Sequence, residues 1–519
     1  MSLLSFIIAH KILEQFDLPF ANLLSSAGGH FHILLPNTPG AEEKLQAFEK
    51  ELDDLAIKDF GAEIRFHLAW HRISSAHLMD FSKSRDELNA DLRKKKLRPL
   101  ASLLQSGTKW NESPFLMDGP SREDERCPVC GKKQLKPEQL ARPENERACD
   151  SCGEDAEMGS KMAGNRFVNV FATASGHSFN LFGCGVEFSK QPSKGALLAL
   201  SLEPQDLGTS CSIPAYPFWV LHKLPSADGR QCEKCDANHC HHLAEGDEPE
   251  KGQPLFFTCL AARAKGRKYI GALKADVDNL GQIFKDGFAE KSQSISRFTT
   301  LSRMLDLFFS GWVAEQINEK SPFIYPVFSG GDDLFLIGPW DQMLDFAFGL
   351  RKDFAGFTAA NPGFSFSAGL TTARPATPVN IIAERAEEIL LKAKREPALE
   401  YASGRDQLNA FGQNLKWDDA GEARNEVETL AAWLDVKKLS VSFVRNLMAY
   451  GDQYYSFRRD NKVGDLIFLP RLAYEIARNF SPKDQEVWDW VNKFKNNKLD
   501  ALEFRAMRWF ARYLLMKKG

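Results

Sequence analysis

In the second half of the chain, short apolar runs alternate with longer segments in which apolar residues recur every three or four positions. The short runs predict strands and the longer segments predict helices. From residue 269 the expected order is strand, helix, strand, strand, helix, strand, helix, over residues 269–277, 296–318, 323–328, 334–337, 341–356, 364–371 and 378–394. This order predicts a split βαβ domain. Pro326 inside one expected strand is unusual, because proline prefers strand starts and edges.

The first part of the chain repeats some of this pattern. Residues 4–16 and 41–57 have helical periodicity, residues 61–70 alternate like a strand, and residues 86–104 form a charged helical segment. Two Gly-Gly turns, each between apolar arms, predict hairpins in SSAGGHFHILLP and, much later, in FSGGDDLFLIGP. The two hairpins suggest a duplicated domain, since their separation far exceeds the spacing of solenoid repeats.

The remaining segments differ in composition. Gly, Pro, Cys and charged residues dominate 106–165, short strands are expected in 166–222, residues 223–253 are polar, and the chain is helical after 418. We therefore expect an α+β multidomain protein with two ferredoxin-like domains. The expected domains are residues 1–105, a linker domain at 106–262, a second ferredoxin-like domain at 263–417 and a helical domain at 418–519.

Composition excludes some classes of protein. The 519 residues are 43% hydrophobic and 26% charged, as in soluble globular proteins. The net charge of −3 argues against a bulk polycation, although a local basic groove for nucleic acid remains compatible with it. No run approaches the roughly 18 apolar residues of a membrane span, and the opening LLSFIIAHKIL lacks the features of a signal peptide. We expect a cytoplasmic protein with no membrane partner.

The strongest candidate site is acidic. Four aspartates end the strand at 269–277 or follow the Gly-Gly turn of the second hairpin: Asp276, Asp278, Asp332 and Asp333. A split βαβ order brings these segments together. Crowded carboxylates raise one another's pKa, and divalent cations with a preference for oxygen ligands remove that repulsion. Two such ions can activate an attacking hydroxyl and stabilise a leaving phosphate. The simpler alternative to a metal site is a solvated acidic turn.

The cysteines form a second strong pattern. Four of the ten are spaced CxxC-x18-CxxC, which suits a tetrahedral structural zinc ion: Cys127, Cys130, Cys149 and Cys152. A later Cys/His group either binds a second zinc ion or belongs to a polar insertion, and its candidate ligands are Cys232, Cys235, His239 and Cys240.

Together these motifs carry a resemblance. SGGDD after ADVDNLG resembles the GGDEF-like polymerase/cyclase palm. Two palms, a four-cysteine linker module between them and C-terminal helices resemble the large subunit of type III CRISPR effector complexes, most closely the III-A (Csm) form. The SGGH-F hairpin near the start and LNAFGQNLKW after the second palm add to this resemblance, which extends over nearly the whole chain.

The resemblance implies an activity. In this family a complex carries a guide RNA and binds a complementary target RNA, and the palm pair then converts ATP into cyclic oligoadenylates. By motif position, Asp276, Asp332 and Asp333 would hold two Mg²⁺ or Mn²⁺ ions and act in catalysis. The nucleotide-binding residues would be Ser329, Gly330, Gly331, Asp278, Lys394, Gly28 and Gly29. Asp278 is alternatively a structural turn residue, and Lys394 is alternatively a solvated residue on a helix face.

The resemblance also implies partners. These are guide and target RNA, other Csm subunits, especially the one that caps the 5′ end of the guide RNA and the small helical subunit, and a separate HD nuclease polypeptide as one option. Basic, aromatic stretches at 93–98 and 505–518 either contact RNA or a neighbouring subunit, or are solvated faces and packed helices.

Two features depart from the family pattern. No His-Asp dipeptide occurs, so HD-type cleavage of DNA is not expected from this chain. The first palm has Gly28-Gly29-His30 where the second has Gly-Gly-Asp-Asp, so we expect it to be catalytically silent, and it lacks a leading strand. Two alternatives stay open: a non-catalytic scaffold that anchors guide RNA, and a stand-alone diguanylate cyclase.

Overall fold

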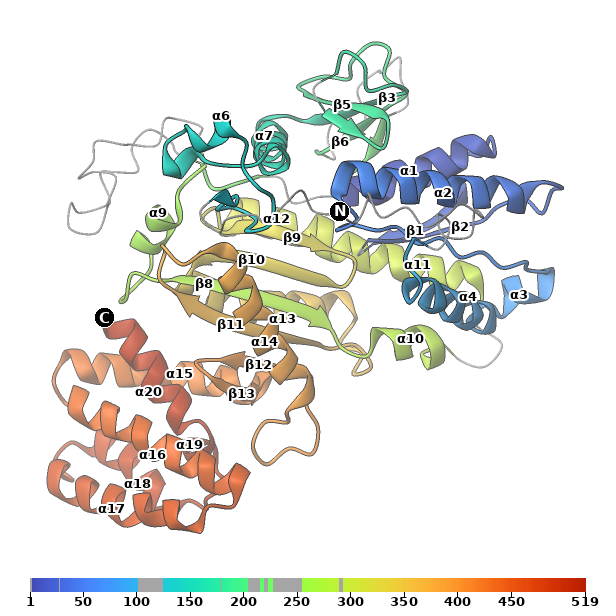
Figure 1. The fold of residues 1–519 in the computed structure, drawn as a ribbon. Helices are drawn as coiled ribbons and strands as arrows, with labels where there is room; N and C mark the ends of the chain where they lie inside the picture. The colour runs from blue at the N-terminus through green and yellow to red at the C-terminus, as the bar shows by residue number, and fades with distance from the viewer. Residues whose placement is uncertain are drawn as a thin grey trace. The chain divides into compact units, whose positions relative to one another are not determined.

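The computed structural model describes residues 2–27, 29–100, 125–177, 179–203, 215–218, 223–226, 254–288 and 293–519 (Figure 1). The chain divides into two compact units. Unit 1 comprises residues 1–222 and 282–307, and unit 2 comprises residues 223–281 and 308–519. In the described parts of the chain, no helix combines the length and the apolarity that a bilayer crossing requires.

The first part of unit 1 is a two-stranded hairpin with helices packed around it. The strands are β1 (Leu23–Ala27) and β2 (His30–Ile33), preceded by a 3-10 turn at Phe20–Asn22. The helices are α1 (Ser2–Gln15), α2 (Ala41–Phe60), α3 (Ser75–Met79), α4 (Phe81–Lys96) and α11 (Ile295–Asp306). One face of α1 packs against α2 through an apolar cluster that includes Ile8, Ile12, Leu45 and Phe48.

The expected strand at 61–70 is wrong. Its side chains do alternate in exposure, and Phe66, Leu68 and Trp70 pack on the α1–α2 cluster. Within the described residues of unit 1, however, this segment pairs with no other strand. Alternation reflects packing of an extended chain on a core, whereas a strand also needs a neighbouring backbone edge. The charged helix expected at 86–104 starts earlier, at Phe81, and ends at Lys96.

The middle of unit 1 is β-rich, as expected. A small α-helical part has α6 (Pro137–Leu140), a 3-10 turn at Glu144–Glu146 and α7 (Asp150–Gly164). A five-stranded sheet follows, in the order β4 (Phe179–Leu181), β5 (Cys184–Ser189), β3 (Phe167–Phe171), β6 (Leu198–Ser201) and β7 (Ala215–Pro217). Ile7 of α1 joins the core of this sheet, so α1 buries residues on two faces.

Unit 2 is built on a six-stranded sheet in the order β13-β12-β11-β8-β10-β9. The strands are β8 (Ile270–Val277), β9 (Tyr325–Gly330), β10 (Asp333–Pro339), β11 (Phe366–Ala373), β12 (Gln407–Ala410) and β13 (Gln413–Lys416). Counting from β8, the first four strands have the order 4-1-3-2 of a ferredoxin-like fold, as the sequence predicted. The β12–β13 hairpin was not expected from the sequence pattern.

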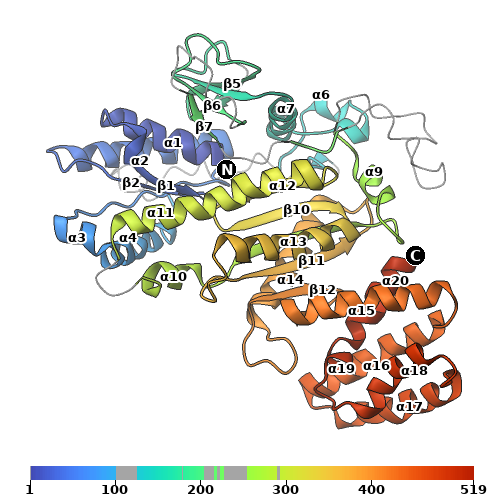
Figure 2. The ribbon, with the colours of Figure 1, turned by 180° about the vertical axis from the view of Figure 1, so that it is seen from behind.

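Helices cover both faces of this sheet. A Cβ at Gly369 would meet α14 (Val379–Arg395), and a Cβ at Gly271 would meet Trp340 and Met343 of α13 (Trp340–Phe357). Figure 1 shows α14 in front of the sheet and Figure 2 shows α13 on the other side. The other helices of unit 2 that precede its last strands are α9 (Phe257–Ala262) and α12 (Val313–Lys320), the latter preceded by a π-helical turn at Leu307–Trp312. Helix α10 (Leu280–Asp286) starts at the end of unit 2 and continues into the second segment of unit 1.

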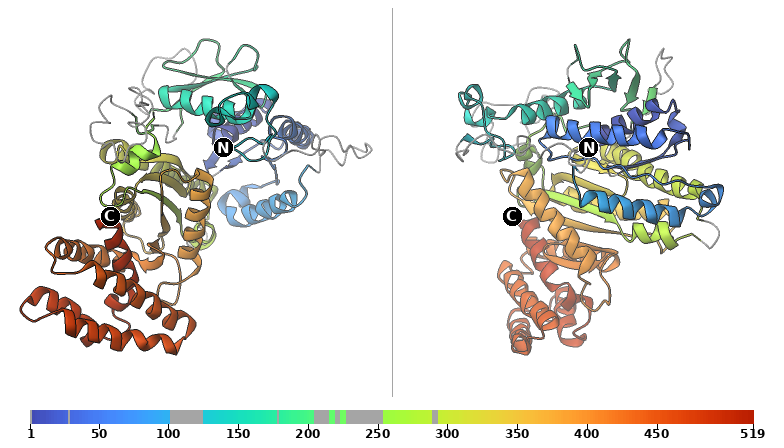
Figure 3. Two further views of the ribbon diagram at one scale, coloured as in Figure 1. Left: turned by 60° about the vertical axis from the view of Figure 1, so that its left-hand side comes forward. Right: turned by 45° about the vertical axis from the view of Figure 1, so that its right-hand side comes forward.

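The C-terminal part of unit 2 is helical, as expected (Figure 3). Its elements are α15 (Trp417–Asp435), α16 (Val441–Asp460), a 3-10 turn at Val463–Ile467, α17 (Phe468–Asn479), α18 (Gln485–Asn496), α19 (Leu502–Arg505) and α20 (Met507–Lys518). The aromatic residues of the last stretch, Trp509, Phe510 and Tyr513, are buried. They therefore pack the helical core, which was one of the two alternatives.

Candidate functional site

The Gly-Gly-Asp-Asp sequence forms a tight hairpin between β9 and β10. Gly330 ends β9 and pairs with Asp333, the first residue of β10, so that Gly331 and Asp332 make a two-residue turn. Gly331 has a φ of 69°, in the left-handed region that favours glycine. A two-residue hairpin with glycine at the first central position matches the turns that follow the natural twist of strands.

This hairpin places Asp333 opposite Asp276 on the central strand. Asp333 of β10 pairs with Asp276 of β8, and Asp276 pairs with Ser367 of β11 on its other side. Because residues directly opposite on antiparallel strands share a face, the two carboxyl groups are neighbours. The backbone N–H of Val277 donates to the carbonyl of Asp332 at 3.0 Å, which fixes the turn beside the end of β8.

The shared face changes from apolar to charged along the sheet. At one end Ile270, Ala272 and Ile337 pack with α9 and α14 in an apolar core. At the other end two lysines form ion pairs: Lys394 of α14 with Asp276, and Lys274 with Glu387 of α14. The sheet–helix packing that buries the apolar end therefore also carries Lys394 onto the aspartates.

Burial and mutual repulsion raise the pKa values of the aspartates. Burial, together with the charges of Asp332 and Asp276, raises the pKa of Asp333 to about 6. Burial also raises the pKa of Asp276 and of Asp332, against the opposing charge of Lys394. Within the described residues, however, only the four linker cysteines bring three or more ligand atoms within 4.8 Å of one another. The aspartates influence one another electrostatically, but their carboxylate oxygens are not all within 4.8 Å of one another.

Asp278 has a different environment from the other aspartates. It is almost fully buried, and its carboxylate accepts hydrogen bonds from the hydroxyls of Ser365 and Ser367 and from the backbone N–H of Asp406, at 2.8–2.9 Å. These three donors occupy both carboxylate oxygens. The geometry favours a structural turn residue, which was the alternative to nucleotide binding.

Ser329 is tied to the π-helical turn. Its hydroxyl donates to the carbonyl of Phe309 at 2.6 Å, and the hydroxyl of Ser310 donates to the carbonyl of Ser329 at 3.4 Å. A π-turn leaves carbonyls free of the usual helical partners, and such turns are frequent at functional sites. Lys274, Ser367 and Phe309 were missed as site neighbours, although Lys274 directly precedes the ADVDNLG motif.

The corresponding hairpin of unit 1 has no acidic residue in the turn. Ala27 pairs with His30, and Gly29 has a φ of 76°. Burial and the charge of Lys96 lower the pKa of His30. Gly28 lies outside the described residues.

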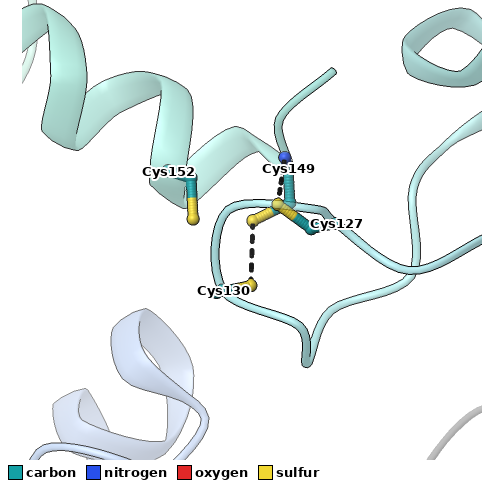
Figure 4. A group of neighbouring side chains, drawn as sticks. All are labelled: Cys127, Cys130, Cys149 and Cys152. Atoms are coloured by element: carbon teal, nitrogen blue, oxygen red, sulfur yellow. Dashed lines mark hydrogen bonds between the residues drawn. The ribbon is translucent and has the colours of Figure 1, made fainter. Parts of the chain in front are cut away.

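The four linker cysteines converge on one point (Figure 4). Cys127 and Cys130 lie on a turn that ends at Gly131, which has a φ of 69°, and Cys149 and Cys152 lie at the start of α7. The Sγ atoms of Cys130 and Cys149 are 4.0 Å apart, close to the ~3.8 Å expected for thiolates about 2.3 Å from a tetrahedral ion. The backbone N–H of Cys149 donates to Cys127 Sγ at 3.3 Å.

The cysteine cluster also stabilises one thiolate. Burial would raise the pKa of Cys127, but hydrogen bonds from the backbone at Cys130, Cys149 and Val129 outweigh it and lower the pKa to about 6. Burial raises the pKa of Cys152. The second Cys/His group, Cys232, Cys235, His239 and Cys240, lies outside the described residues.

Comparisons with known proteins find that this chain is similar to CRISPR proteins. One family model, "Cas10/Cmr2, second palm domain", matches residues 269–408, and another, "Csm1 subunit domain B", matches residues 1–111. Two curated relatives are named CRISPR system single-strand-specific deoxyribonuclease Cas10/Csm1 (subtype III-A). The relative from Thermococcus onnurineus is 24% identical over 80% of this chain and 52% of its own length. The relative from Enterococcus italicus is 26% identical over 96% of this chain and 60% of its own length.

Solved structures share the fold. The apo Csm1-Csm4 cassette matches all of this chain and 66% of its own chain, with a TM-score of 0.68 and 19% identity. The cassette in complex with cA4 matches with the same TM-score and identity, over 65% of its own chain. The chain thus spans only about half to two thirds of the length of the proteins that it matches. Both family models and these relatives agree: the chain is similar to Cas10/Csm1 proteins of subtype III-A in residues 1–111 and 269–408 and over most of its length.

Proposed function

We propose that this chain is the large subunit of a type III-A CRISPR complex and makes cyclic oligoadenylates from ATP when the complex binds target RNA. The observation that carries the proposal is the row formed by Asp333 and Asp276 on neighbouring strands, with Asp332 in the adjoining turn and Lys394 against Asp276. A scaffold has no need for a partly buried acidic cluster with raised pKa values.

The residues fit divalent cations by their chemistry. Asp276, Asp332 and Asp333 supply hard oxygen donors. Their pKa values are raised first by burial and then by neighbouring carboxylates, and a cation would offset both effects. Bound Mg²⁺ or Mn²⁺ ions would lower the pKa of an attacking hydroxyl and neutralise charge on the phosphates. Lys394 would then release Asp276 and remain available as a cation for the phosphates.

In the proposed reaction, the 3′-hydroxyl of one ATP gives its proton to solvent, and its oxygen forms a bond to the α-phosphorus of another ATP. The bond between that phosphorus and the bridging oxygen breaks, and pyrophosphate leaves. Gly330 and Gly331, which carry no side chain, would let the hairpin backbone approach the nucleotide closely, and Ser329 would hold the hairpin through its bond to Phe309. Gly28 and Gly29 would shape the site of the second ATP in a catalytically silent first palm.

The solved relatives support this substrate. Csm1-Csm4 cassettes have been solved with one ATP, with AMPPNP, with cA3 and with cA4. By analogy we propose ATP as the substrate of this chain, and the Csm4 subunit, the small helical subunit and the guide and target RNAs as its partners. The curated relatives are named as deoxyribonucleases, but we still expect no HD-type cleavage of DNA from this chain.

We also propose that Cys127, Cys130, Cys149 and Cys152 bind one structural zinc ion. The convergence of four Sγ atoms and the backbone N–H donated to Cys127 support this assignment. Cys232, Cys235, His239 and Cys240 remain candidates for a second zinc ion.

The choice of nucleotide separates the proposal from a diguanylate cyclase. The assembled complex, with matching target RNA and Mg²⁺ or Mn²⁺, is incubated with ATP or with GTP, and products are identified by mass spectrometry. We expect cyclic adenylates from ATP and no cyclic dinucleotide from GTP. Product from GTP without target RNA would favour the diguanylate cyclase. Product from neither nucleotide, in a complex shown to bind target RNA, would favour the scaffold.

A further inference from the structure

Unit 2 contains a cavity of about 440 Å³ between its sheet and its C-terminal helices. On the sheet side it is lined by residues 370–372 of β11, by Ile389 of α14 and by residues 411–412, the turn of the β12–β13 hairpin. On the other side it is lined by residues of α16 and α20. We call this cavity the arginine pocket, because Arg267 and Arg512 are in its lining.

One face of α20 brings arginines to the pocket. Arg508, Arg512 and Met516 recur every four residues and therefore lie on the same face of this helix. A Cβ at Gly451 of α16 would meet the backbone of Arg508 at 2.6 Å, so the two helices cross closely there. The backbone N–H of Arg267 donates to the carbonyl of Met516 at 2.9 Å, which holds a third arginine beside the same face.

These arginines have few acidic partners. Arg508 and Arg512 share one carboxylate, that of Asp452, at N–O distances of 2.9 and 3.7 Å. Burial and the charge of Arg508 lower the pKa of Arg512, and the charge of Asp452 opposes them. Arg267 is exposed, and in the part of the chain that the structure describes its guanidinium forms no ion pair. Three guanidinium groups with one carboxylate leave positive charge that an anion would neutralise.

The edge of the sheet adds hydrogen-bonding groups. Strand β12 pairs with β11 only as far as Leu370, which lies opposite Ala410. Beyond this point Thr371 and Thr372 pair with β8, and within the described residues no strand lies along their other edge. Their hydroxyls and the backbone N–H groups of this edge can donate to a bound oxyanion.

The rest of the lining is apolar and includes Met448 of α16 and Ile389, Leu515 and Met516. Methionine side chains adapt to ligands of irregular shape. The volume is within the range of small-molecule sites, roughly 300–1,000 Å³. The cations are all arginines, whose planar fork can donate two hydrogen bonds to one phosphate. A ligand that fits both halves has a phosphate group at one end and an apolar ring at the other.

We propose that the arginine pocket binds a nucleoside phosphate, either a free nucleotide or the terminal nucleotide of an RNA. Its phosphate would lie against Arg267 and Arg512, and its base would lie among Met448, Ile389 and the end of α20. The inference does not depend on cyclase activity, because none of these residues belongs to the acidic row of Asp276, Asp332 and Asp333.

The arginine pocket is separate from the acidic row. Ser367 of β11 lies opposite Asp276, whereas Thr372 at the pocket lies opposite Gly271, five residues further along β11. Five residues of extended strand span roughly 16 Å. A mononucleotide in the arginine pocket therefore does not reach the aspartates.

The binding test uses the full chain in buffer free of Mg²⁺ and Mn²⁺, so that no nucleotide is held at the acidic row through these ions. Isothermal titration compares AMP, inorganic phosphate and the RNA trimer pApApA. We expect AMP or pApApA to bind at least roughly tenfold more tightly than inorganic phosphate, because the base buries apolar surface. Tighter binding of AMP would identify a free nucleotide as the source, and tighter binding of pApApA would identify an RNA end. Binding of neither, or equal binding of inorganic phosphate, would overturn the proposal.

Photochemical cross-linking locates the bound nucleotide. 8-Azido-AMP is irradiated with the chain, and tryptic peptides are analysed by mass spectrometry. We expect adducts in the peptide 446–458, which contains Met448, or in 513–517, which contains Leu515 and Met516. Adducts confined to residues 329–333 would overturn the proposal, because the nucleotide would then lie at the acidic row.

Arg267 allows a test that leaves the fold intact, because only its backbone makes hydrogen bonds within the described residues. Arg267→Glu should weaken nucleotide binding at least roughly tenfold by replacing a cation with an anion. Arg478→Glu makes the same change in net charge at an exposed arginine of α17 outside the lining, and should leave binding unchanged. Thermal melts check that both variants fold. If Arg267→Glu does not fold, Arg267→Gln removes the charge alone and should weaken binding about fivefold. Equal binding by wild type and the Arg267 variants, or an equal loss in Arg478→Glu, would contradict the proposal.

Discussion

Lys394 and Asp276 form the contact on which the candidate site is organised. The ammonium group lies against a partly buried carboxylate that also faces Asp333 across two strands. The positive charge of Lys394 also lowers the pKa of Asp332 and of Asp333, against the burial that raises both. Its position predicts a role that other lysines of α14 cannot fill.

Lys394→Ala should lower cyclic adenylate formation by about ten- to a hundredfold, because a preorganised cation is lost from the phosphate site. Lys392→Ala is the matched control, since Lys392 is more exposed and forms an ion pair with Glu388 on the same helix, away from the aspartates. Rates are measured on assembled complexes at saturating ATP. Equal loss in both variants would mean that Lys394 acts only through the stability of α14.

Asp333 predicts a pH dependence of stability. Its pKa is raised from 3.8 to about 6, so between these values the folded state holds a proton that the unfolded chain releases. Stability is therefore lost as the pH rises through this window and stays lower at pH 7. Without added Mg²⁺ or Mn²⁺, Asp333→Asn should raise the unfolding free energy at pH 7 by about 1 kcal/mol, after allowance for solvent screening.

Thermal melts of wild type and Asp333→Asn at pH 4 and pH 7 check this expectation. The difference should vanish near pH 4, where both side chains are neutral. A variant that is less stable than wild type at pH 7 would show that the carboxylate is stabilised in the fold.

Sequence reasoning located the acidic row but not its surroundings. Asp276, Asp332 and Asp333 could be grouped because the strand order brings their segments together. The partners of Asp278 come from residues 365, 367 and 406, and no local pattern encodes such long-range hydrogen bonds. The link between Ser329 and Phe309 depends on a π-turn, which hydrophobic periodicity does not reveal.

At the scale of elements, the β9–β10 hairpin sets the position of the acids. Gly331→Ala places a side chain at a φ of 69° and should destabilise unit 2 by about 1 kcal/mol while lowering activity more than stability explains. Gly349→Ala is the control, because Gly349 is in α13 and an added Cβ there meets nothing within 4 Å. That change should be neutral or stabilising by up to ~1 kcal/mol. Denaturant melts and product rates of both variants are compared, and an unaffected Gly331→Ala would contradict the proposed geometry.

We expect the fold around the four-cysteine cluster to depend on a bound metal ion. Cys152→Ser should lose one zinc ion per chain, measured by elemental analysis, and should speed hydrogen exchange over residues 125–164 because the metal links the two knuckles. Cys184→Ser changes a buried cysteine of β5 outside the cluster and should keep its zinc. Unchanged zinc content in Cys152→Ser would remove the cluster from consideration as a metal site.

At the scale of the whole molecule, hydrophobic periodicity predicted the strands correctly where each strand has neighbouring strands to pair with. The strand order of unit 2 follows from its hydrophobic pattern, because β10 and β11 both pair with β8. The same reasoning failed at residues 61–70, where the pattern is present but the pairing partner is not among the described residues. The β12–β13 hairpin was missed since its buried polar residues, such as Gln407 and Asn414, carry no apolar signal.

The most direct test of the proposed function is the double variant Asp332→Ala/Asp333→Ala in the assembled complex. Complex with bound target RNA, ATP and Mn²⁺ is incubated, and products are read by mass spectrometry. We expect cyclic adenylates from wild type, and none from a double variant that assembles and binds target RNA normally. Undiminished product from the variant would contradict the assignment of the site, and no product from wild type would contradict the cyclase itself.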